Sequence, residues 1–214
     1  MDEVITFVRG MPPANAHCHS NGGGWVANTA HVDASAYVGP HAKVAEHAQV
    51  LGNAKILDHA LVSGHAIIRD NAVLSEGCYV KGHAEVSENA EVSESAVITD
   101  YSHIHGNAKV SGSVYVREEA EIFENAKVLG CIYIQGKSKV YGNAVVSGTE
   151  NSMSGESRAY GNAKLFGEAS MVDTSELFGD AKLYGGVTLR GTTKVCGSIH
   201  ICKSEDIDKG MCHD

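Results

Sequence analysis

Aliphatic side chains recur at every sixth position along most of this chain. The series runs without a gap from Val26 to Val146, resumes one residue out of phase at Met153 and continues to Ile201. A helix repeats every 3.6 residues and a strand every second residue, so neither element alone explains a period of six. A hexad pattern is typical of a parallel β-helix, in which each hexad contributes one short strand and one inward side chain.

Small residues and asparagines mark the corners of this predicted helix. The position four residues after each aliphatic side chain is alanine or cysteine from Ala36 to Ala96, and a small side chain fits near a corner. Asparagine recurs every 18 residues from Asn53 to Asn143, which is the spacing of one corner in a coil of three hexads. Asparagine tolerates the left-handed backbone that a sharp corner requires, and stacked amides can hydrogen-bond to one another. The sequence therefore predicts an all-β fold, a parallel β-helix of about ten three-sided coils in a single solenoid domain.

The hexads divide the chain into three parts. Residues 25–202 form the predicted hexapeptide-repeat β-helix. We expect residues 1–24 to form an N-terminal cap, because an open end of a β-helix would otherwise recruit another chain. Residues 203–214 follow as a polar, acidic tail that discourages end-to-end stacking.

The hexads VSGSVY at residues 110–115, VLGNAK at 50–55 and VSGHAI at 62–67 resemble those of hexapeptide-repeat proteins. This superfamily has a left-handed parallel β-helix and includes trimeric acyltransferases and gamma-class carbonic anhydrases. The resemblance implies a homotrimer, with acyl-CoA bound along the grooves between subunits and a histidine acting as general base. Acyltransferases of this kind usually carry a protruding loop, whereas the largest interruption of the hexads here is one residue.

Two functions are consistent with this pattern. The nearly unbroken hexads favour a trimeric scaffold or binding protein, which would hold a small ligand or a protein partner in the grooves between subunits. The alternative is an acyl-CoA-dependent acyltransferase. Its candidate catalytic residues are His103 and His105, which flank the inward Ile104 and so project outward, where a histidine can act as general base. Two exposed polar residues without a catalytic role would show the same pattern.

Three other histidines, His47, His65 and His83, are 18 residues apart and should stack at one corner. Such a stack could bind a divalent metal ion. Histidine also suits a corner through its tolerance of left-handed backbone. We favour the corner interpretation and keep the metal site as the alternative.

Outward aromatic and basic residues are predicted to stack as well. Tyr115 lies one coil from Tyr133, and Lys109 lies one coil from Lys127. We consider these four residues candidates for ligand binding. Large apolar side chains outside a closed solenoid are also typical of an interface between subunits, which again favours a homotrimer.

Composition narrows the choice of partners. The formal net charge is −9, with 17 Lys and Arg against 26 Asp and Glu, so we expect no nucleic-acid partner. The chain has no long apolar run and no signal-like N-terminus, which predicts a cytoplasmic protein without a membrane partner. The 6 cysteines show no CxxC pairing, so we expect free thiols and no disulfide.

Overall fold

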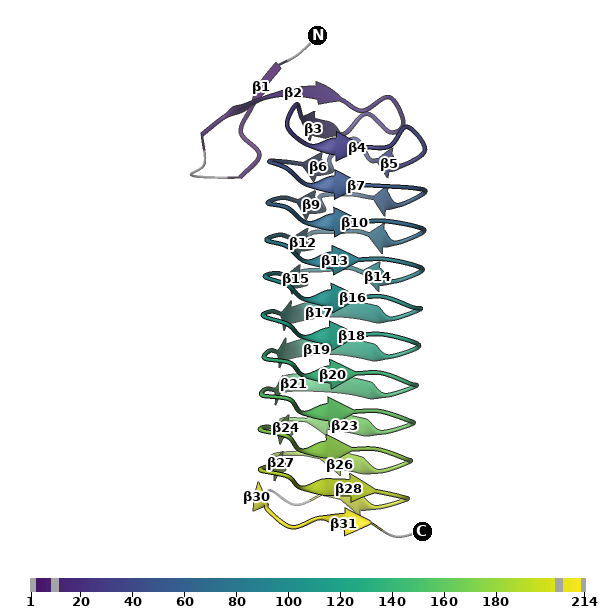
Figure 1. Cartoon of the computed structure of the whole chain (residues 1–214), viewed down its shortest axis with the longest axis vertical. Coiled ribbons are helices and arrows are strands. Elements are labelled where there is room, and N and C mark those ends of the chain that lie inside the picture. Colours follow the sequence, from purple (N-terminus) through teal and green to yellow (C-terminus); the bar gives the residue numbers. More distant parts are fainter. Residues whose placement is uncertain (1–2, 9–11, 203–205, 213–214) are drawn as a thin grey trace.

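The computed structural model describes residues 3–8, 12–202 and 206–212. Its strands form a three-sided prism, in which each coil adds one strand to each of the three faces and the strands within a face run parallel (Figure 1). The described residues contain strands and turns and no helix. Within this part of the chain there is accordingly no helix long and apolar enough to cross a membrane. The predicted all-β class, the single solenoid domain and the number of coils, about 10, are confirmed.

Face 1 is an 11-stranded parallel sheet. Its strands are β4 (His31–Val32), β7 (Gln49–Val50), β10 (Ile67–Ile68), β13 (Glu85–Val86), β16 (His103–Ile104), β18 (Glu121–Ile122), β20 (Lys139–Val140), β22 (Arg158–Ala159), β25 (Glu176–Leu177), β28 (Lys194–Cys196) and β31 (Met211–Cys212).

Faces 2 and 3 share three long strands that run around the corner between them: β17 (Lys109–Val116), β19 (Lys127–Ile134) and β21 (Val145–Met153). Face 2 also contains β5 (Tyr37–Val38), β8 (Lys55–Ile56), β11 (Val73–Leu74), β14 (Glu91–Val92), β23 (Lys164–Gly167), β26 (Lys182–Tyr184) and β29 (His200–Ile201). Face 3 also contains β3 (Trp25–Ala27), β6 (Lys43–Val44), β9 (Leu61–Val62), β12 (Tyr79–Val80), β15 (Val97–Ile98), β24 (Ser170–Met171), β27 (Thr188–Leu189) and β30 (Asp206–Ile207).

The coils wind in a left-handed sense. In Figure 1 the chain crosses face 1 from left to right, returns behind it, and descends from the N-terminal to the C-terminal end. Seen from the N-terminal end, this path turns counter-clockwise as it recedes, which defines a left-handed helix. The predicted left-handed β-helix is therefore confirmed.

The inward positions of the hexads form one continuous core. Ile56, Ile104 and Leu165 are fully buried, as are the small companion residues Ala54 and Ala60. Burial of each large aliphatic side chain contributes roughly 1.5–3 kcal/mol. Because every coil packs on its neighbours, these contributions accumulate along the prism and no coil is stable alone.

The corners place left-handed residues one position before the predicted asparagines. Asp70 and Glu88 have φ angles of 64° and 60°, whereas the following Asn71 and Asn89 do not have positive φ. The expectation that asparagine itself adopts the left-handed conformation is therefore wrong. The predicted amide ladder is present: Asn71 Nδ2 donates to Asn89 Oδ1 at 3.2 Å, and the ladder continues to Asp180.

A β-bulge between β19 and β21 accounts for the change of phase in the hexads. Thr149 and Asn151 pair with consecutive residues of β19, so the pairing skips Glu150, which has a φ of 66°. Asn151 consequently points inward and is fully buried. Its Nδ2 donates to the carbonyl oxygens of Ser147 and Leu165, at 3.1 and 3.3 Å.

The two ends of the prism differ in structure. β1 (Glu3–Ile5) pairs antiparallel with β2 (Ala14–Cys18), and β2 pairs antiparallel with β3. These strands lie across the N-terminal end in Figure 1. At the other end, β30 and β31 lie within residues 203–214 and continue faces 3 and 1.

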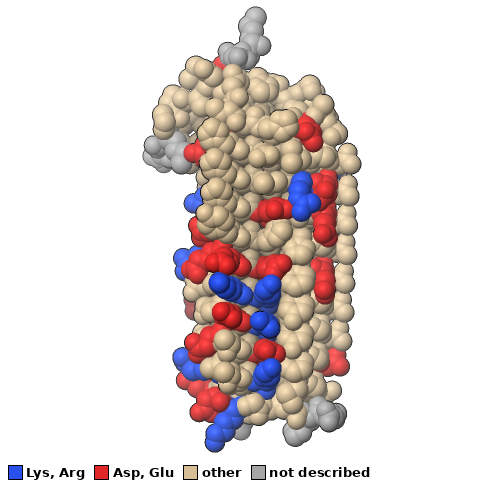
Figure 2. Space-filling model, in the orientation of Figure 1, with Lys and Arg blue, Asp and Glu red and all other residues tan. Residues whose placement is uncertain are grey.

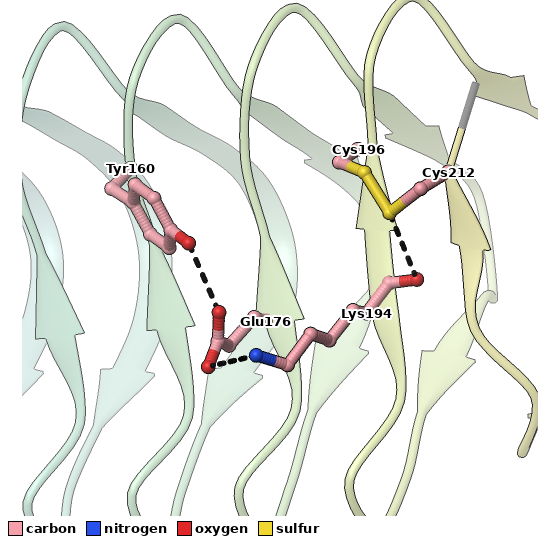
Figure 3. Close-up of a disulfide and its surroundings, with 5 residues drawn as sticks. All are labelled: Tyr160, Glu176, Lys194, Cys196 and Cys212. Atoms are coloured by element: carbon pink, nitrogen blue, oxygen red, sulfur yellow. Dashed lines mark hydrogen bonds and ion pairs between the residues drawn. A yellow bond between two sulfur atoms is a disulfide. The ribbon is translucent and has the colours of Figure 1, made fainter. Parts of the chain in front are cut away.

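A disulfide joins Cys196 of β28 to Cys212 of β31 (Figure 3). The expectation of free thiols is wrong for this pair. The two residues are only 16 positions apart, because the last coil is short, and this brings Cys212 directly opposite Cys196 with their Cα atoms 4.7 Å apart. The free cysteines are Cys18, Cys78, Cys131 and Cys202.

Candidate functional site

His103 and His105 lie on either side of the buried Ile104, and both project from face 1. The centres of their rings are 4.9 Å apart and the ring planes are tilted by 42°. The parallel register places Glu85 of β13 on one side of His103 and Glu121 of β18 on the other. We call Glu85, His103, His105 and Glu121 the face-1 cluster.

Each histidine of the face-1 cluster faces a carboxylate. His103 Nε2 lies 3.1 Å from Glu85 Oε1, and His105 Nε2 lies 3.0 Å from Glu121 Oε1. The other ring nitrogen of His105, Nδ1, lies 4.0 Å from Glu88 Oε1. A carboxylate beside an imidazole fixes the orientation and tautomer of the ring, which suits both general-base chemistry and metal binding.

Two cations flank the cluster. Arg69 Nε lies 2.6 Å from Glu85, and Lys139 Nζ lies 2.5 Å from Glu121. Partial burial opposes ionisation of both carboxyl groups. The neighbouring histidine and cation outweigh it in each case and hold the pKa of Glu85 and of Glu121 below its ordinary value. Both side chains are therefore carboxylates at neutral pH, and Figure 2 shows acidic and basic side chains intermixed on this face.

The cluster is partly buried and borders a shallow depression. The side chains of His105 and Glu121 are each 23% exposed. The depression has a volume of about 590 Å³ and is lined by Tyr101, His103, Glu119 and Glu121. Ligand atoms of His103, His105 and Glu121 all lie within 4.8 Å of one another. Within the described part of the chain, these three side chains form the group that could hold a metal ion.

His105 also begins a column of stacked rings. The centre of Phe123 lies 5.1 Å from that of His105, with the planes 3° apart. Tyr141, Tyr160 and Phe178 continue the column at spacings of 4.8 to 4.9 Å. Figure 2 shows an uncharged column beside the charged side chains of face 1. The ring column thus supports His105 from the C-terminal side.

Tyr160 belongs to a chain of polar contacts near the disulfide (Figure 3). Its hydroxyl donates to Glu176 at 3.0 Å, and Glu176 also pairs with Lys194 at 3.2 Å. Burial, and then the contact with Glu176, raise the pKa of Tyr160 to about 12. Tyr160 is therefore a hydrogen-bond donor at neutral pH and not a base.

The four ligand-binding candidates lie on two different faces. Lys109 and Lys127 stand at the starts of β17 and β19 on face 2, and Tyr115 and Tyr133 stand near the ends of the same strands on face 3. The tyrosine rings stack with their centres 5.3 Å apart. Lys109 pairs with Glu91 at 2.8 Å. The structure brings these residues together as two separate pairs and not as one site.

His47, His65 and His83 stack with Tyr101 at the corner between faces 3 and 1. Their ring centres are 5.0 to 5.2 Å apart, and the planes differ by 12° or less. Parallel rings direct their nitrogen lone pairs along parallel lines, so three nitrogens do not converge on one ion in this arrangement. A metal-binding role for these histidines stays a prediction that requires the rings to turn.

Sequence reasoning missed the two carboxylates of the face-1 cluster. Glu85 and Glu121 lie one coil before and one coil after His103 in the same outward column. The 18-residue spacing that relates the stacked histidines could have identified both glutamates.

No protein-family model and no curated protein matches this sequence. Its repeated hexads and left-handed coils decide the fold. The chain is a left-handed parallel β-helix built from six-residue repeats. Among solved structures it is similar to that of the Arabidopsis UDP-N-acetylglucosamine acyltransferase, with 13% identity, a TM-score of 0.33, and coverage of 80% of this chain and 69% of that chain. The left-handed β-helix that the resemblance to hexapeptide-repeat proteins implied is confirmed by the strand pairing and the coil direction of this chain itself.

Proposed function

We propose that this β-helix is a non-enzymatic homotrimeric scaffold, in which face 3 of each chain packs against the other two copies. The proposal rests mainly on one observation, an uncharged column on face 3 that is partly exposed at Leu61, Tyr79 and Val97 and exposed at its two C-terminal tyrosines. Tyr115 and Tyr133 belong to this column and are 41% and 43% exposed. Its outward positions in successive coils are Leu61, Tyr79, Val97, Tyr115 and Tyr133.

The ring column of face 1 is a weaker candidate for this interface. Its members Phe123 and Tyr141 are only partly exposed, since they stack on one another and lie beside charged side chains. Tyr115 and Tyr133 of face 3 are instead among the large apolar side chains that are exposed in the described part of the chain. An exposed apolar patch of this kind usually marks an interface. Because the coils are regularly spaced, face 3 of one copy can pack against face 3 of another copy coil by coil.

Native mass spectrometry of the full chain tests this proposal. We expect a trimer for the wild type and monomers for the double variant Tyr115→Glu/Tyr133→Glu. The trimer would bury the two introduced carboxylates in the interface without a partner, which is unfavourable. The matched control is Phe166→Glu/Tyr184→Glu on face 2, where the rings also stack, with their centres 5.4 Å apart. The control should remain trimeric. A monomeric wild type, or a trimer that survives the face 3 variant, contradicts the proposal.

A second candidate function is acyl transfer with a histidine as general base. The observation that favours it is the contact of His105 Nε2 with Glu121 Oε1 at 3.0 Å, since a carboxylate-oriented imidazole can accept a proton from an acceptor substrate. Release of free CoA from acetyl-CoA in the presence of amine and hydroxyl acceptors measures the activity. Turnover that persists in His103→Ala/His105→Ala rejects this role for both residues.

A further inference from the structure

We propose that His103, His105 and Glu121 bind one divalent transition-metal ion of the zinc class on face 1. The ion would be held within a single chain, so this proposal does not depend on trimer formation. It differs from the corner stack of histidines, since it uses the two outward positions on either side of Ile104 and a third position one coil further on. The group combines two imidazoles with one carboxylate.

The distances are close to those that a bound ion requires. Nitrogen and oxygen ligands lie about 2.0–2.2 Å from zinc, so two ligands of a tetrahedral ion are about 3.3 Å apart. His105 Nε2 and Glu121 Oε1 are 3.0 Å apart. All three ligand atoms lie within 4.8 Å of one another. The His103 side chain must therefore move closer to the other two ligands to complete the group.

Neighbouring side chains place charged groups beside each of these ligands. Lys139 binds Oε2 of Glu121 and leaves Oε1 directed at His105. A metal-bound imidazole usually donates its other N–H to a carboxylate or carbonyl. Glu85 lies 3.1 Å from His103 Nε2, and Glu88 lies 4.0 Å from His105 Nδ1. Each histidine thus has a carboxylate beside it that is not part of the ligand group.

The ligand set also indicates the kind of ion. Two histidines and one glutamate match the protein ligands of zinc sites that keep a fourth position open. Mg²⁺ and Ca²⁺ prefer oxygen ligands throughout, so a nitrogen-rich group disfavours them. The depression lined by His103 and Glu121 leaves space on the solvent side for a water or a ligand in the fourth position.

Titration of the full chain with Zn²⁺ against a chromophoric zinc chelator tests the proposal. We expect one Zn²⁺ per chain and an affinity at least about tenfold weaker in His105→Phe and in Glu121→Gln. Phenylalanine suits position 105 because it extends the ring column that continues at Phe123. The control His47→Ala/His65→Ala removes two stacked histidines elsewhere and should bind Zn²⁺ like the wild type.

Each other outcome overturns the proposal. Absence of stoichiometric Zn²⁺ binding by the wild type does so directly. Unchanged affinity in both His105→Phe and Glu121→Gln, or a loss confined to the His47→Ala/His65→Ala control, assigns the ion to another place. Far-UV circular dichroism of every variant establishes that it is folded. The visible spectrum of the Co²⁺-loaded wild type gives a second criterion: intense bands indicate four or five ligands, and a weak six-coordinate spectrum contradicts the proposed site.

Discussion

The carboxylate of Glu118 accepts a hydrogen bond from the backbone N–H of Gly136, 2.9 Å away in the following coil. Glu118 itself has a φ of 63°. Among the described residues, all non-glycine residues with positive φ are aspartate or glutamate. The hydrogen bond to the next coil offsets the cost of the left-handed backbone, which is otherwise about 1–2 kcal/mol. The same bond is made by Asp58, Asp70, Asp100, Glu124 and Asp173.

Replacing Glu118 with alanine should destabilise the protein more than replacing it with glycine. Both changes remove the hydrogen bond to Gly136, which contributes about 1 kcal/mol. Alanine additionally keeps a Cβ in the left-handed conformation, whereas glycine adopts that conformation without a steric penalty. Urea denaturation of the two variants should therefore differ by about 1 kcal/mol in the free energy of unfolding. An alanine variant as stable as the glycine variant would show that the backbone at this corner is not strained.

Removing the β-bulge should stabilise the prism when its buried amide is removed as well. Deletion of Glu150 restores the 18-residue spacing, and Asn151→Val makes the inward position apolar, like Val114 in an earlier coil. We expect the combined change to raise the free energy of unfolding by about 1–3 kcal/mol, because a buried amide is costly. Asn151→Val alone should raise the free energy of unfolding by less. It keeps the bulge but removes the amide that donates to the carbonyl oxygens of Ser147 and Leu165. A combined variant less stable than Asn151→Val alone would contradict this account.

The contribution of Glu121 to stability should depend on pH. Lys139 and His105 outweigh the effect of burial and lower its pKa in the folded protein, so its ionised form stabilises the fold at neutral pH, and this effect is lost as the pH falls through the lowered pKa. The destabilisation caused by Glu121→Gln should therefore be largest near neutral pH and should shrink as the pH falls below the ordinary pKa of a glutamate, about 4.3. Thermal unfolding across this range measures the difference. Glu119→Gln is the control and should have little effect on stability. Glu119 lies 3.6 Å from Lys137 Nζ and both side chains are exposed to solvent, so this ion pair contributes little.

Reduction of the disulfide should loosen the C-terminal coil and leave the middle of the prism unchanged. A disulfide that closes a loop of about 15 residues contributes roughly 3 kcal/mol. In Cys212→Ser, the amides of β28 and β31 should exchange hydrogen faster than in the wild type, whereas those of β16 should keep their protection. Cys202→Ser is the control, because Cys202 is exposed and free. Equal exchange of β31 in the wild type and in Cys212→Ser would show that strand pairing alone holds this end.

The core and the coil could be predicted from the sequence because they depend on side-chain polarity at a fixed period. Ile104 and Leu165 occupy inward positions on opposite sides of the bulge, and both are buried as their hexads predict. The left-handed residues could not be predicted in this way. Intrinsic preference favours asparagine at positive φ, but a carboxylate such as that of Asp70 gains its partner, the N–H of Glu88, only after two coils have stacked.

The candidate site was likewise predictable only in part. The outward direction of His103 and His105 follows from the hexad, because they flank an inward residue. The contact of Glu121 with His105 depends on side-chain conformations, which the period does not determine. The disulfide was missed for another reason. Cys196 and Cys212 are 16 residues apart, and a rule based on a period of 18 does not pair them.

The pairing of each strand with the next coil also has a consequence for folding kinetics. Strand partners such as Glu121 and Lys139 are 18 residues apart wherever they occur in the regular coils. In a chain of 214 residues, this separation corresponds to a relative contact order of about 0.08, a value typical of helical bundles and far below that of β-sandwiches. The prism can therefore fold from any nucleus by adding adjacent coils. Adding coils to the chain would not increase the sequence separation between strand partners.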